Sequence, residues 1–567
     1  GLDNLTKIAE AEKRINQDPE RAGEPFSIAS IPLDDKDVFD MLSRGETGGV
    51  FQMEGDGFTR FLLRLKPDRF EDLIAAVALY RPGPLNGGMV DTYIECKHGR
   101  QKVEYLHPLL EDCLRETYGV IVYQEQVMQA ARVMAGFSLG AADLMRRAMG
   151  KKKVEEMKRL REEFVKGALQ LHPDLVTEEQ AQFVFDKIEF FSGYGFNKSH
   201  SATYALIGYQ TAYLRAHYPV EFIAGILSCE RSKPERVMRF LNVAKDMGIH
   251  VLPPDINQSS EDFTIVRDAE GKKVVRFGLG ALKGVGEVAV TSMIQVRAEG
   301  PFTSLWDVCE RVDSRKVNKA VLETLIRAGA MDSLCPGLQP ERARPAMLAE
   351  LENAMRQGQR NQKEKASKQI SLFEMMAPES LPVEEHKLPD VEPWTKMEML
   401  NHEKAILGMY VSGHPLDSVL LKNGNKVVAR EWTHTVGELD DIQPPEDMEE
   451  EGRHQVYDIT TVGVLSEVIE RRSKETKNRY LQGEIDGMDG LVQFHVSFKN
   501  VEKLESKLVL GEPLLFKGNL EISRDRDGNL RRMFRLMEVE RLVDARQKDV
   551  KFLQVDIDLE SEDAQML

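Results

Sequence analysis

The sequence contains little cysteine and tryptophan, and its charge shows no excess of basic residues. Only five cysteines and three tryptophans occur among 567 residues. The cysteines are far apart, odd in number and form no CxxC pair, which argues against a structural zinc site and indicates free thiols in a reducing cytoplasm. The twelve histidines show no paired ligand spacing. We therefore expect no metal site in this chain.

Long apolar runs and an initiator methionine are also missing. No run reaches the roughly 18 apolar residues of a membrane span, and no signal peptide opens the chain, so we expect no membrane partner. The first residue is Gly1, from which we expect a processed chain or a piece of a larger protein. The net charge of −17 argues against nucleic-acid binding through bulk charge but leaves room for local basic tracks.

The composition is that of a soluble globular protein, with 42% hydrophobic and 30% charged residues. At about 150 residues per domain, the length predicts roughly four units. Residues 1–225 are predicted to be mostly helical, including a helix over 201–218 that Ser199 or Ser201 caps and Pro219 ends.

The rest of the chain, after residue 230, is predicted to form further segments of different composition. Residues 231–334 are predicted as a second unit, in which strands at 263–266 and 274–277 precede a glycine-rich turn and helices. Residues 335–454 are predicted to be a linker and connecting segment, with a polar, helix-prone stretch at 341–368. Residues 455–545 show the period-two alternation of strands, and 546–567 form a tail.

Within 455–545, hydrophobic and polar residues alternate, and Asp527-Gly528 is a hairpin turn signal. The apolar positions of one predicted strand are Val492, Phe494, Val496 and Phe498. This pattern predicts a small β-barrel. The fold class is therefore multidomain and mainly α, with a small OB-like barrel near the C-terminus.

A basic track runs through the predicted helices at 145–166. Nine basic and four acidic residues fall there, a local excess of +5. Such local charge suits phosphates, because each neutralised phosphate releases condensed counterions. No P-loop pattern surrounds Gly150-Lys151. The alternative interpretation is a solvated helical face.

Two further segments could contact phosphates through helix starts or backbone amides. The segment from Tyr194 to Ser201 combines aromatics, Lys198 and hydroxyls just before a helix, which suits an anion unless it is an ordinary capped helix start. The stretch Lys283-Gly284-Val285-Gly286 is typical of a helix-hairpin-helix turn, which points backbone N–H groups at a DNA phosphate. The alternative is a generic glycine turn.

A short apolar motif lies between the polar helix and a proline-containing linker. It consists of Gln369, Ile370, Ser371, Leu372 and Phe373. Apolar anchors with one amide suit docking into a preformed pocket of a partner. The alternative is that Leu372 and Phe373 fold back onto a core.

A basic loop joins two predicted strands of the barrel. Its basic residues are Arg471, Arg472, Lys474, Lys477 and Arg479, and Tyr480 follows them. On an OB-like barrel, single-stranded nucleic acid could follow this loop while aromatics such as Tyr480 stack on bases. The alternative is a soluble hairpin tip.

Taken in order, these segments resemble one family. With the blocks ALYRPGPL at 78–85, YGVIVYQEQVM at 118–128 and GYGFNKSHSATYAL at 193–206, the chain resembles the bacterial replicative DNA polymerase III alpha subunit, a family C polymerase. The resemblance runs from about residue 3 to 545. It implies a fingers-like region at 1–225, a clamp-binding-like domain with its helix-hairpin-helix turn at 231–334, a sliding-clamp motif at 369–373 and an OB domain for the single-stranded template at 455–545.

The resemblance also implies roles for individual residues. In the fingers-like region, basic and amide side chains would hold the incoming deoxynucleoside triphosphate or the primer-template backbone. These candidates are Arg81, Lys97, Arg100, Gln124, Arg146, Arg147, Lys151, Lys152, Lys153, Lys198 and His200. Lys283, Gly284 and Gly286 would contact the DNA backbone.

One part of the family pattern is missing. Nucleotidyl transfer uses carboxylates that hold two metal ions about 4 Å apart, and in this family they lie in palm motifs that precede the region matched here. The resemblance thus implies a carboxy-terminal portion of a polymerase, whose Mg²⁺ is held by an N-terminal palm-containing portion, and which works with other replicase subunits. We expect no catalytic residue here and an inactive chain when alone. Alternatives are a non-catalytic adaptor that binds DNA and the clamp, or a scaffold without a nucleic-acid role.

Overall fold

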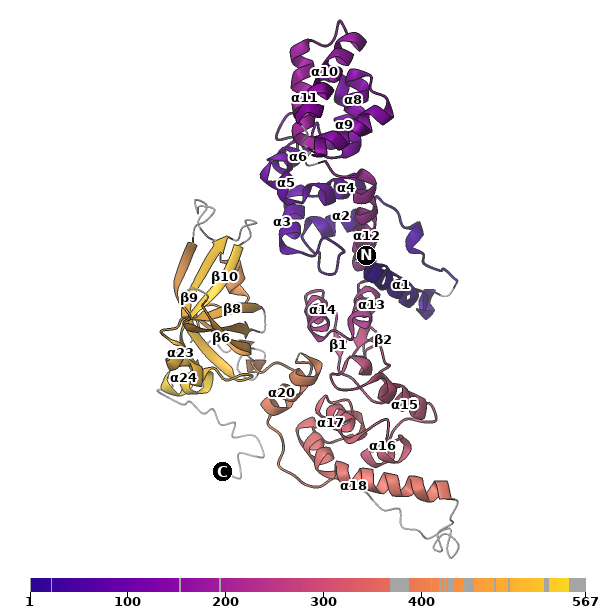
Figure 1. Ribbon diagram of the computed structural model, residues 1–567. Helices are drawn as coiled ribbons and strands as arrows, with labels where there is room; N and C mark the ends of the chain where they lie inside the picture. The colour runs from indigo at the N-terminus through magenta and orange to yellow at the C-terminus, as the bar shows by residue number, and fades with distance from the viewer. Residues whose placement is uncertain are drawn as a thin grey trace, which may run out of the picture. The chain divides into compact units, whose positions relative to one another are not determined.

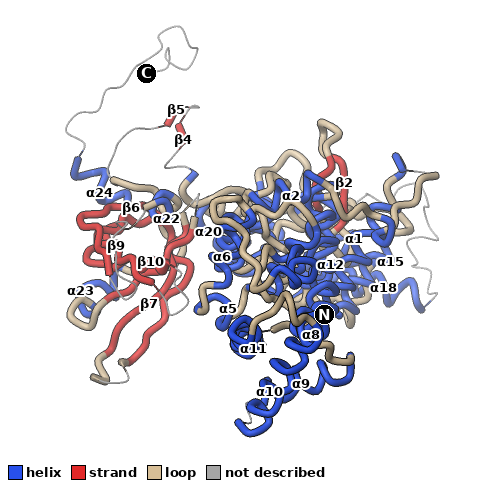
Figure 2. The backbone as a smooth tube through the Cα atoms, turned by 90° about the horizontal axis from the view of Figure 1, so that it is seen from above, coloured by secondary structure: helices blue, strands red, loops and turns tan. Residues whose placement is uncertain are grey.

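The computed structural model describes residues 2–21, 23–151, 154–192, 195–367, 387–408, 410–417, 421–422, 425–426, 432–442, 444, 453–473, 476–487, 490–524 and 530–549. These residues form helices along most of the chain and a cluster of strands near its C-terminal end (Figures 1 and 2). Residue contacts group them into two compact units, Gly1–Val251 with Asp262–Arg276, and Leu252–Glu261 with Phe277–Leu567. The five segments proposed from the sequence remain a prediction.

The first unit is built from helices around two hydrophobic cores. The first core buries apolar side chains of α2 (Lys36–Ser43), α3 (Asp56–Leu65), α4 (Phe70–Leu79), α6 (Met89–Lys97) and α12 (Lys198–His217). α4 is wholly buried after its first two residues, which its run of apolar residues explains. This core fixes the position of α12, whose first turn carries several of the predicted site residues.

The second core joins four helices in the next part of the chain. It lies among α8 (Gln124–Ala135), α9 (Leu139–Lys151), α10 (Val154–Leu171) and α11 (Glu178–Ser192), which Figure 1 shows gathered together. The basic track therefore lies on α9 and α10, whose apolar faces are buried. The short helices α5 (Pro82–Asn86) and α7 (Glu111–Leu114) connect these elements.

The remaining elements of the first unit are its first helix, α1, the helices after α12, and a small sheet. α1 (Leu2–Asn16) packs against α13 (Pro219–Glu230), which α14 (Pro234–Asp246) follows. β2 (Thr264–Arg267) and β3 (Lys273–Arg276) pair antiparallel, as the sequence predicts for 263–266 and 274–277, and β1 (Val251–Leu252) joins them.

The second unit begins with helices around the glycine turn. They are α15 (Glu287–Arg297), α16 (Leu305–Arg311), α17 (Lys319–Arg327), α18 (Pro340–Ser367) and α20 (Lys396–Leu407). The polar stretch predicted to be helix-prone is α18. Short elements β4 (Leu421–Lys422), β5 (Asn425–Lys426) and α22 (Glu438–Asp441) follow.

Five strands close the predicted barrel. They are β6 (Arg453–Arg472), β7 (Arg479–Asp486), β8 (Leu491–Val496), β9 (Pro513–Arg524) and β10 (Leu530–Arg541), in the order β10-β8-β7-β6-β9. β9 and β10 pair antiparallel on either side of Asp527-Gly528, residues outside the described part. α23 (Val501–Leu504) and α24 (Leu542–Asp549) flank the strands. The mainly α fold with a small OB-like barrel is confirmed.

The alternation in β8 is correct except at its end. Val492, Phe494 and Val496 are buried in the barrel core, as predicted. Phe498 lies beyond the last residue of β8 and is 52% exposed. The alternation extended the strand to Phe498, whereas β8 ends at Val496.

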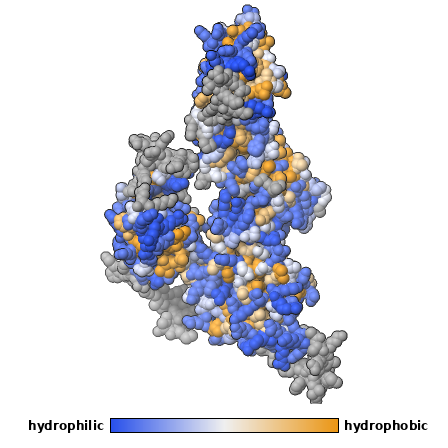
Figure 3. All heavy atoms as spheres, viewed as in Figure 1, coloured by the Kyte–Doolittle hydropathy of each residue, from blue (hydrophilic) through white to orange (hydrophobic). Residues whose placement is uncertain are grey.

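No described helix has the length and apolarity to cross a membrane. On the face seen in Figure 3, hydrophobic side chains form several separate patches among hydrophilic ones.

Candidate nucleic-acid interface

The start of α12 is joined to the start of α8 by a short parallel bridge. The Phe196 amide donates to the Val122 carbonyl at 3.1 Å, and the Gln124 amide donates to the Phe196 carbonyl at 2.9 Å. The Gln124 side chain extends this junction. Its Nε2 donates to the Gly195 carbonyl at 3.1 Å, and its Oε1 accepts from Arg146 Nη1 at 3.0 Å.

The N-terminus of α12 is already capped by side chains of the protein. The Asn197 side chain accepts from the His200 amide at 2.8 Å, and Glu125 accepts from the Lys198 amide at 3.0 Å. The cap is therefore Asn197 rather than Ser199 or Ser201, and a carboxylate lies where an anion was considered. The backbone amides at this helix start are therefore occupied, as in an ordinary capped helix, so only its side chains are left to contact a ligand.

A pocket lies beside this junction and brings two predicted residues together. Its volume is about 350 Å³, and its lining includes Arg81, His200 and four aromatic rings. Those rings belong to Phe58, Tyr80, Phe196 and Tyr204. The Arg81 guanidinium lies over the Phe196 ring, 4.3 Å from its centroid, and burial lowers the Arg81 pKa. A half-buried cation among aromatic rings suits a nucleotide, whose base stacks and whose phosphates carry charge.

The backbone of this pocket is strained at one position. Gln52, which lines the pocket, has φ of 63°, in the left-handed region that non-glycine residues rarely adopt. Such outliers cluster at functional sites. No sequence pattern singled out Gln52 or Phe58. Tyr80 belongs to the ALYRPGPL block at 78–85, but nothing in that block predicted that its ring lines a pocket.

Other predicted residues of the fingers-like region are engaged in ion pairs. Lys198 Nζ lies 2.7 Å from Glu116 Oε2 and over the Tyr123 ring. Arg146 and Arg147 both pair with Asp143 at 2.8 Å, but Arg147 keeps 64% of its side chain exposed. These residues still present positive groups close to the α8–α12 junction.

Two predicted residues are placed differently. Lys97 is 4% exposed and lies 2.8 Å from both Asp68 and Asp72, so it stabilises the first core rather than facing solvent. Arg100 pairs with Glu95 through two nitrogens, at 2.7 and 2.8 Å. Lys151 ends α9, and Lys152 and Lys153 lie outside the described residues.

The glycine turn lies between a short 3-10 helix, η5 (Leu279–Ala281), and α15. Lys283, Gly284 and Gly286 are exposed, while Leu282 and Val285 beside them are buried. Gly284 has φ of 93°, which favours glycine, and Gly286 is the N-cap of α15. The turn therefore presents backbone to solvent on a firmly anchored loop.

The basic loop of the barrel joins β6 to β7. Arg471 and Arg472 end β6 and are exposed, and Lys477 lies exposed in the turn. Arg479 pairs with Glu470 at 2.9 Å and with Glu505. Lys474 lies outside the described residues, as do Gln369, Ile370, Ser371, Leu372 and Phe373.

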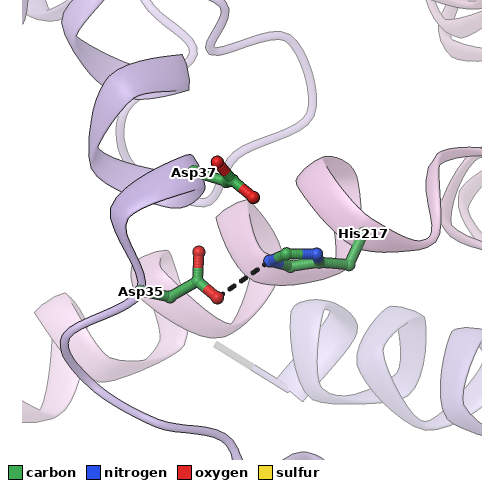
Figure 4. Close-up of side chains that lie close together, drawn as sticks. All are labelled: Asp35, Asp37 and His217. Carbon is green, nitrogen blue, oxygen red and sulfur yellow. Dashed lines mark hydrogen bonds and ion pairs between the residues drawn. The ribbon is translucent and has the colours of Figure 1, made fainter.

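One cluster of potential metal ligands occurs among the described residues. Ligand atoms of Asp35, Asp37 and His217 lie within 4.8 Å of one another (Figure 4). Asp35 already accepts from the Val38 amide at 3.1 Å, capping α2, and lies 3.0 Å from His217 Nε2. We assign the Asp35–His217 contact to the tertiary link between α2 and the end of α12.

This cluster does not fit the two Mg²⁺ ions of nucleotidyl transfer. It offers an imidazole and only two carboxylates, one of them used as a helix cap. It also lies at the opposite end of α12 from Lys198, about 28 Å away at 1.5 Å per residue. No chemical step is therefore assigned to a metal held by the described residues.

Two segments of the chain match known families. Residues 4–172 match the family described as bacterial DNA polymerase III alpha subunit finger domain, and residues 248–343 match the helix-hairpin-helix motif. The chain is 39% identical to DNA polymerase III subunit alpha of Escherichia coli K12 over all of its own length and 47% of that protein, in the carboxy-terminal portion.

Other relatives carry the same name. DNA polymerase III subunit alpha of Thermus aquaticus is 46% identical over 73% of this chain and 32% of the relative. That of Pseudomonas aeruginosa is 44% identical over 74% of this chain and 36% of the relative. The chain spans about half the length of the E. coli protein, and its matches to the other two relatives cover about a third of their lengths. On its finger domain, its helix-hairpin-helix motif and this identity, the chain belongs to the family of bacterial DNA polymerase III alpha subunits.

Proposed function

We propose that this chain binds primer-template DNA and the incoming deoxynucleoside triphosphate as part of a replicative DNA-directed DNA polymerase. The observation that carries the proposal is the pocket in which Arg81 lies over Phe196 beside His200. Its four aromatic walls and half-buried cation match the two parts of a nucleotide. The family relationship supports this assignment.

The surrounding basic side chains suit the DNA backbone. Arg146 is hydrogen-bonded to Gln124 and Arg147 is largely exposed, and both lie on α9 beside the junction. Because phosphate contacts depend on counterion release, binding through α9 and α10 should weaken steeply with salt. Lys283 and the exposed glycines of the hairpin would add contacts to the DNA backbone.

The catalytic carboxylates and their Mg²⁺ are proposed to lie in an N-terminal palm-containing portion of the polymerase. The proposal also assigns Gln369–Phe373 to the sliding clamp and the barrel to the single-stranded template. Under it, this chain supplies no catalytic residue and works with that portion, the clamp and other replicase subunits.

Binding of labelled primer-template by the full chain, followed by fluorescence anisotropy over a range of salt, tests the DNA part. Arg147→Glu should weaken binding at least 5-fold and reduce the salt dependence, because it replaces a phosphate-binding charge with a repelling one. Arg360→Glu is the matched control, since Arg360 is also an exposed helical arginine with an i,i+4 partner. Equal binding by both variants and the wild type would contradict the proposal.

The nucleotide part is tested by titrating dATP onto the chain bound to primer-template. Arg81→Ala should weaken dATP binding about 10-fold, because a charge-assisted contact of about 1.4 kcal/mol is lost. Arg64→Ala removes an exposed arginine of the same unit, paired with Asp91, and should have no effect. DNA and clamp binding without any nucleotide dependence would instead favour an adaptor.

A further inference from the structure

A second pocket lies on the outside of the barrel, at the turn between β6 and β7. Its volume is about 430 Å³, within the range of about 300–1,000 Å³ typical of small-molecule sites. Its lining is aromatic and small polar residues without a carboxylate. The residues are Ser473, Thr476, Asn478, Tyr480, His495, Ser497 and Phe498.

The strand register explains why these side chains meet. Arg471 pairs with Tyr480 across β6 and β7, and His495 pairs with Gln482 of β7 and with Arg535 of β10. Paired residues share a face of the sheet, and alternate residues lie on opposite faces. Since Leu481 and Phe494 fill the barrel core, Tyr480 and His495 lie on the outer face.

Two rings form the wall of this pocket. Tyr480 and His495 are stacked, with centroids 5.2 Å apart and planes at 28°. The Nδ1 atom of His495 is buried and has no hydrogen-bond partner among the described residues. Burial and then the neighbouring Arg535 lower the His495 pKa, which keeps the imidazole neutral. A neutral ring with an unused nitrogen can donate to or accept from a ligand.

A third ring is exposed at the mouth. Phe498 is 52% exposed, although phenylalanine is normally buried in a fold of this kind. Lys499 Nζ lies 5.9 Å from its ring centroid. Exposed Arg471, Arg472 and Lys477 lie at the neighbouring turn. Aromatic surface framed by cations is the combination that binds unpaired nucleotides.

We propose that this pocket holds one unpaired base of single-stranded DNA, stacked on Phe498 and Tyr480, with its edge facing His495 and the flanking phosphates on Arg471 and Arg472. The inference rests on the proposed role of the barrel in carrying the single-stranded template, and it adds Phe498 and His495 as base-contacting residues. Asn478, Ser473 and Ser497 supply further hydrogen-bonding groups without selecting one base by charge.

The test is binding of the full chain to a 5′-labelled 20-mer of deoxythymidine, measured by anisotropy at several salt concentrations. Phe498→Ala should raise the Kd about 5- to 100-fold, because one base loses its stacking surface. The slope of log Kd against log salt should stay unchanged. Replacing Arg471 and Arg472 by Gln should instead reduce that slope by up to about 0.7 per lost phosphate contact.

The matched control is Tyr457→Ala, which removes another exposed aromatic ring of the same barrel outside the pocket. It should leave the Kd within 2-fold of the wild type. In photocrosslinking, a 20-mer that contains 5-iododeoxyuridine should become attached to Tyr480, His495 or Phe498.

The outcomes separate the two proposals. If the wild type binds the 20-mer but Phe498→Ala binds equally well and the crosslinks map elsewhere, the base pocket is wrong while the proposed function stands. If neither the wild type nor any variant binds single-stranded DNA, both the base pocket and the proposed role of the barrel are wrong. Phe498→Leu, which keeps an apolar side chain, controls for local folding and should still lose most of the stacking contribution.

Discussion

At the scale of single residues, the most informative side chain is Arg344, which lies within the polar helix α18. It is 1% exposed and bridges Glu403 at 2.8 Å and Asp332 at 2.6 Å. Glu403 in turn accepts from the Ser412 hydroxyl and amide. This buried network ties α18 to α20 and to the segment that leads toward the barrel.

Arg344→Met should destabilise this region by about 3–5 kcal/mol, because it leaves the buried Glu403 carboxylate without its cation. Hydrogen exchange of the amides of α18 and α20 measures the effect. Arg342→Met is the control, since Arg342 lies two residues away on the same helix and is exposed. A change below 1 kcal/mol would show that the network contributes little.

The lowered pKa of His495 predicts that the stability of the barrel depends on pH. Its folded-state pKa is lowered by burial and by Arg535, below the ordinary value of 6.5. The unfolded chain therefore binds the proton more readily, so stability falls as the pH drops from 6.5 toward the folded pKa. The charged and titratable groups that face this imidazole are Tyr480, Arg535 and Glu521.

The measurement is thermal unfolding of the barrel between pH 7.5 and pH 5.5, for the wild type and for His495→Gln. The variant should lose less stability on acidification, and the difference between the two curves isolates His495 from other groups. Parallel curves would contradict the assignment.

Residue-level prediction from sequence succeeded where a side chain's role follows from local pattern. The burial of Phe494 and Val496 follows from strand alternation. The ion pairs of Lys97 and Arg344 could not be foreseen, because a lysine or arginine has the same local signature whether it faces phosphate or a buried carboxylate. Only the fold brings Asp68, Asp72 and Glu403 to these two cations.

At the scale of elements, the helix-hairpin-helix turn offers a clean test. A Cβ added at Gly286 would meet no heavy atom within 4 Å, and its backbone, with φ of −81°, is open to any residue. Its glycine is therefore not required for folding of the turn. Under the proposed function, this glycine allows the close approach of a DNA phosphate.

Gly286→Ala should weaken binding of double-stranded DNA about 3- to 10-fold while the melting temperature changes little. Anisotropy and thermal unfolding measure the two effects. Gly284→Ala is the contrasting variant, since φ of 93° strains any other residue and should lower stability as well. Unchanged DNA binding by Gly286→Ala would indicate a purely structural turn.

Elements were predicted well where periodicity or turn chemistry is strong. The hairpin of β2 and β3 and the strands of the barrel appear where the sequence placed them. The exact ends of elements were predicted less well, as Phe498 and the Asn197 cap show. Competing caps and strand ends differ by small free energies. The base pocket beside Tyr480 depends on the register of three strands, which no local pattern reveals.

At the scale of the whole molecule, the chain carries three separate surfaces to which the proposed function assigns contacts with nucleotide or DNA. The fingers-like pocket, the exposed hairpin glycines and the outer face of the barrel lie in different parts of the chain. Each offers a different chemistry, namely a cation over an aromatic ring, an exposed glycine backbone and stacked aromatic rings. The proposed function assigns all three to one template.

The most direct test of this account is primer extension with Mg²⁺ and all four deoxynucleoside triphosphates, on this chain alone and mixed with a palm-containing portion of a DNA polymerase III alpha subunit. The account predicts no extension by the chain alone and extension in the mixture, which Arg81→Ala and Arg147→Glu should reduce. Extension by the chain alone would contradict it, as would a mixture that stays inactive while the chain still binds DNA and the clamp.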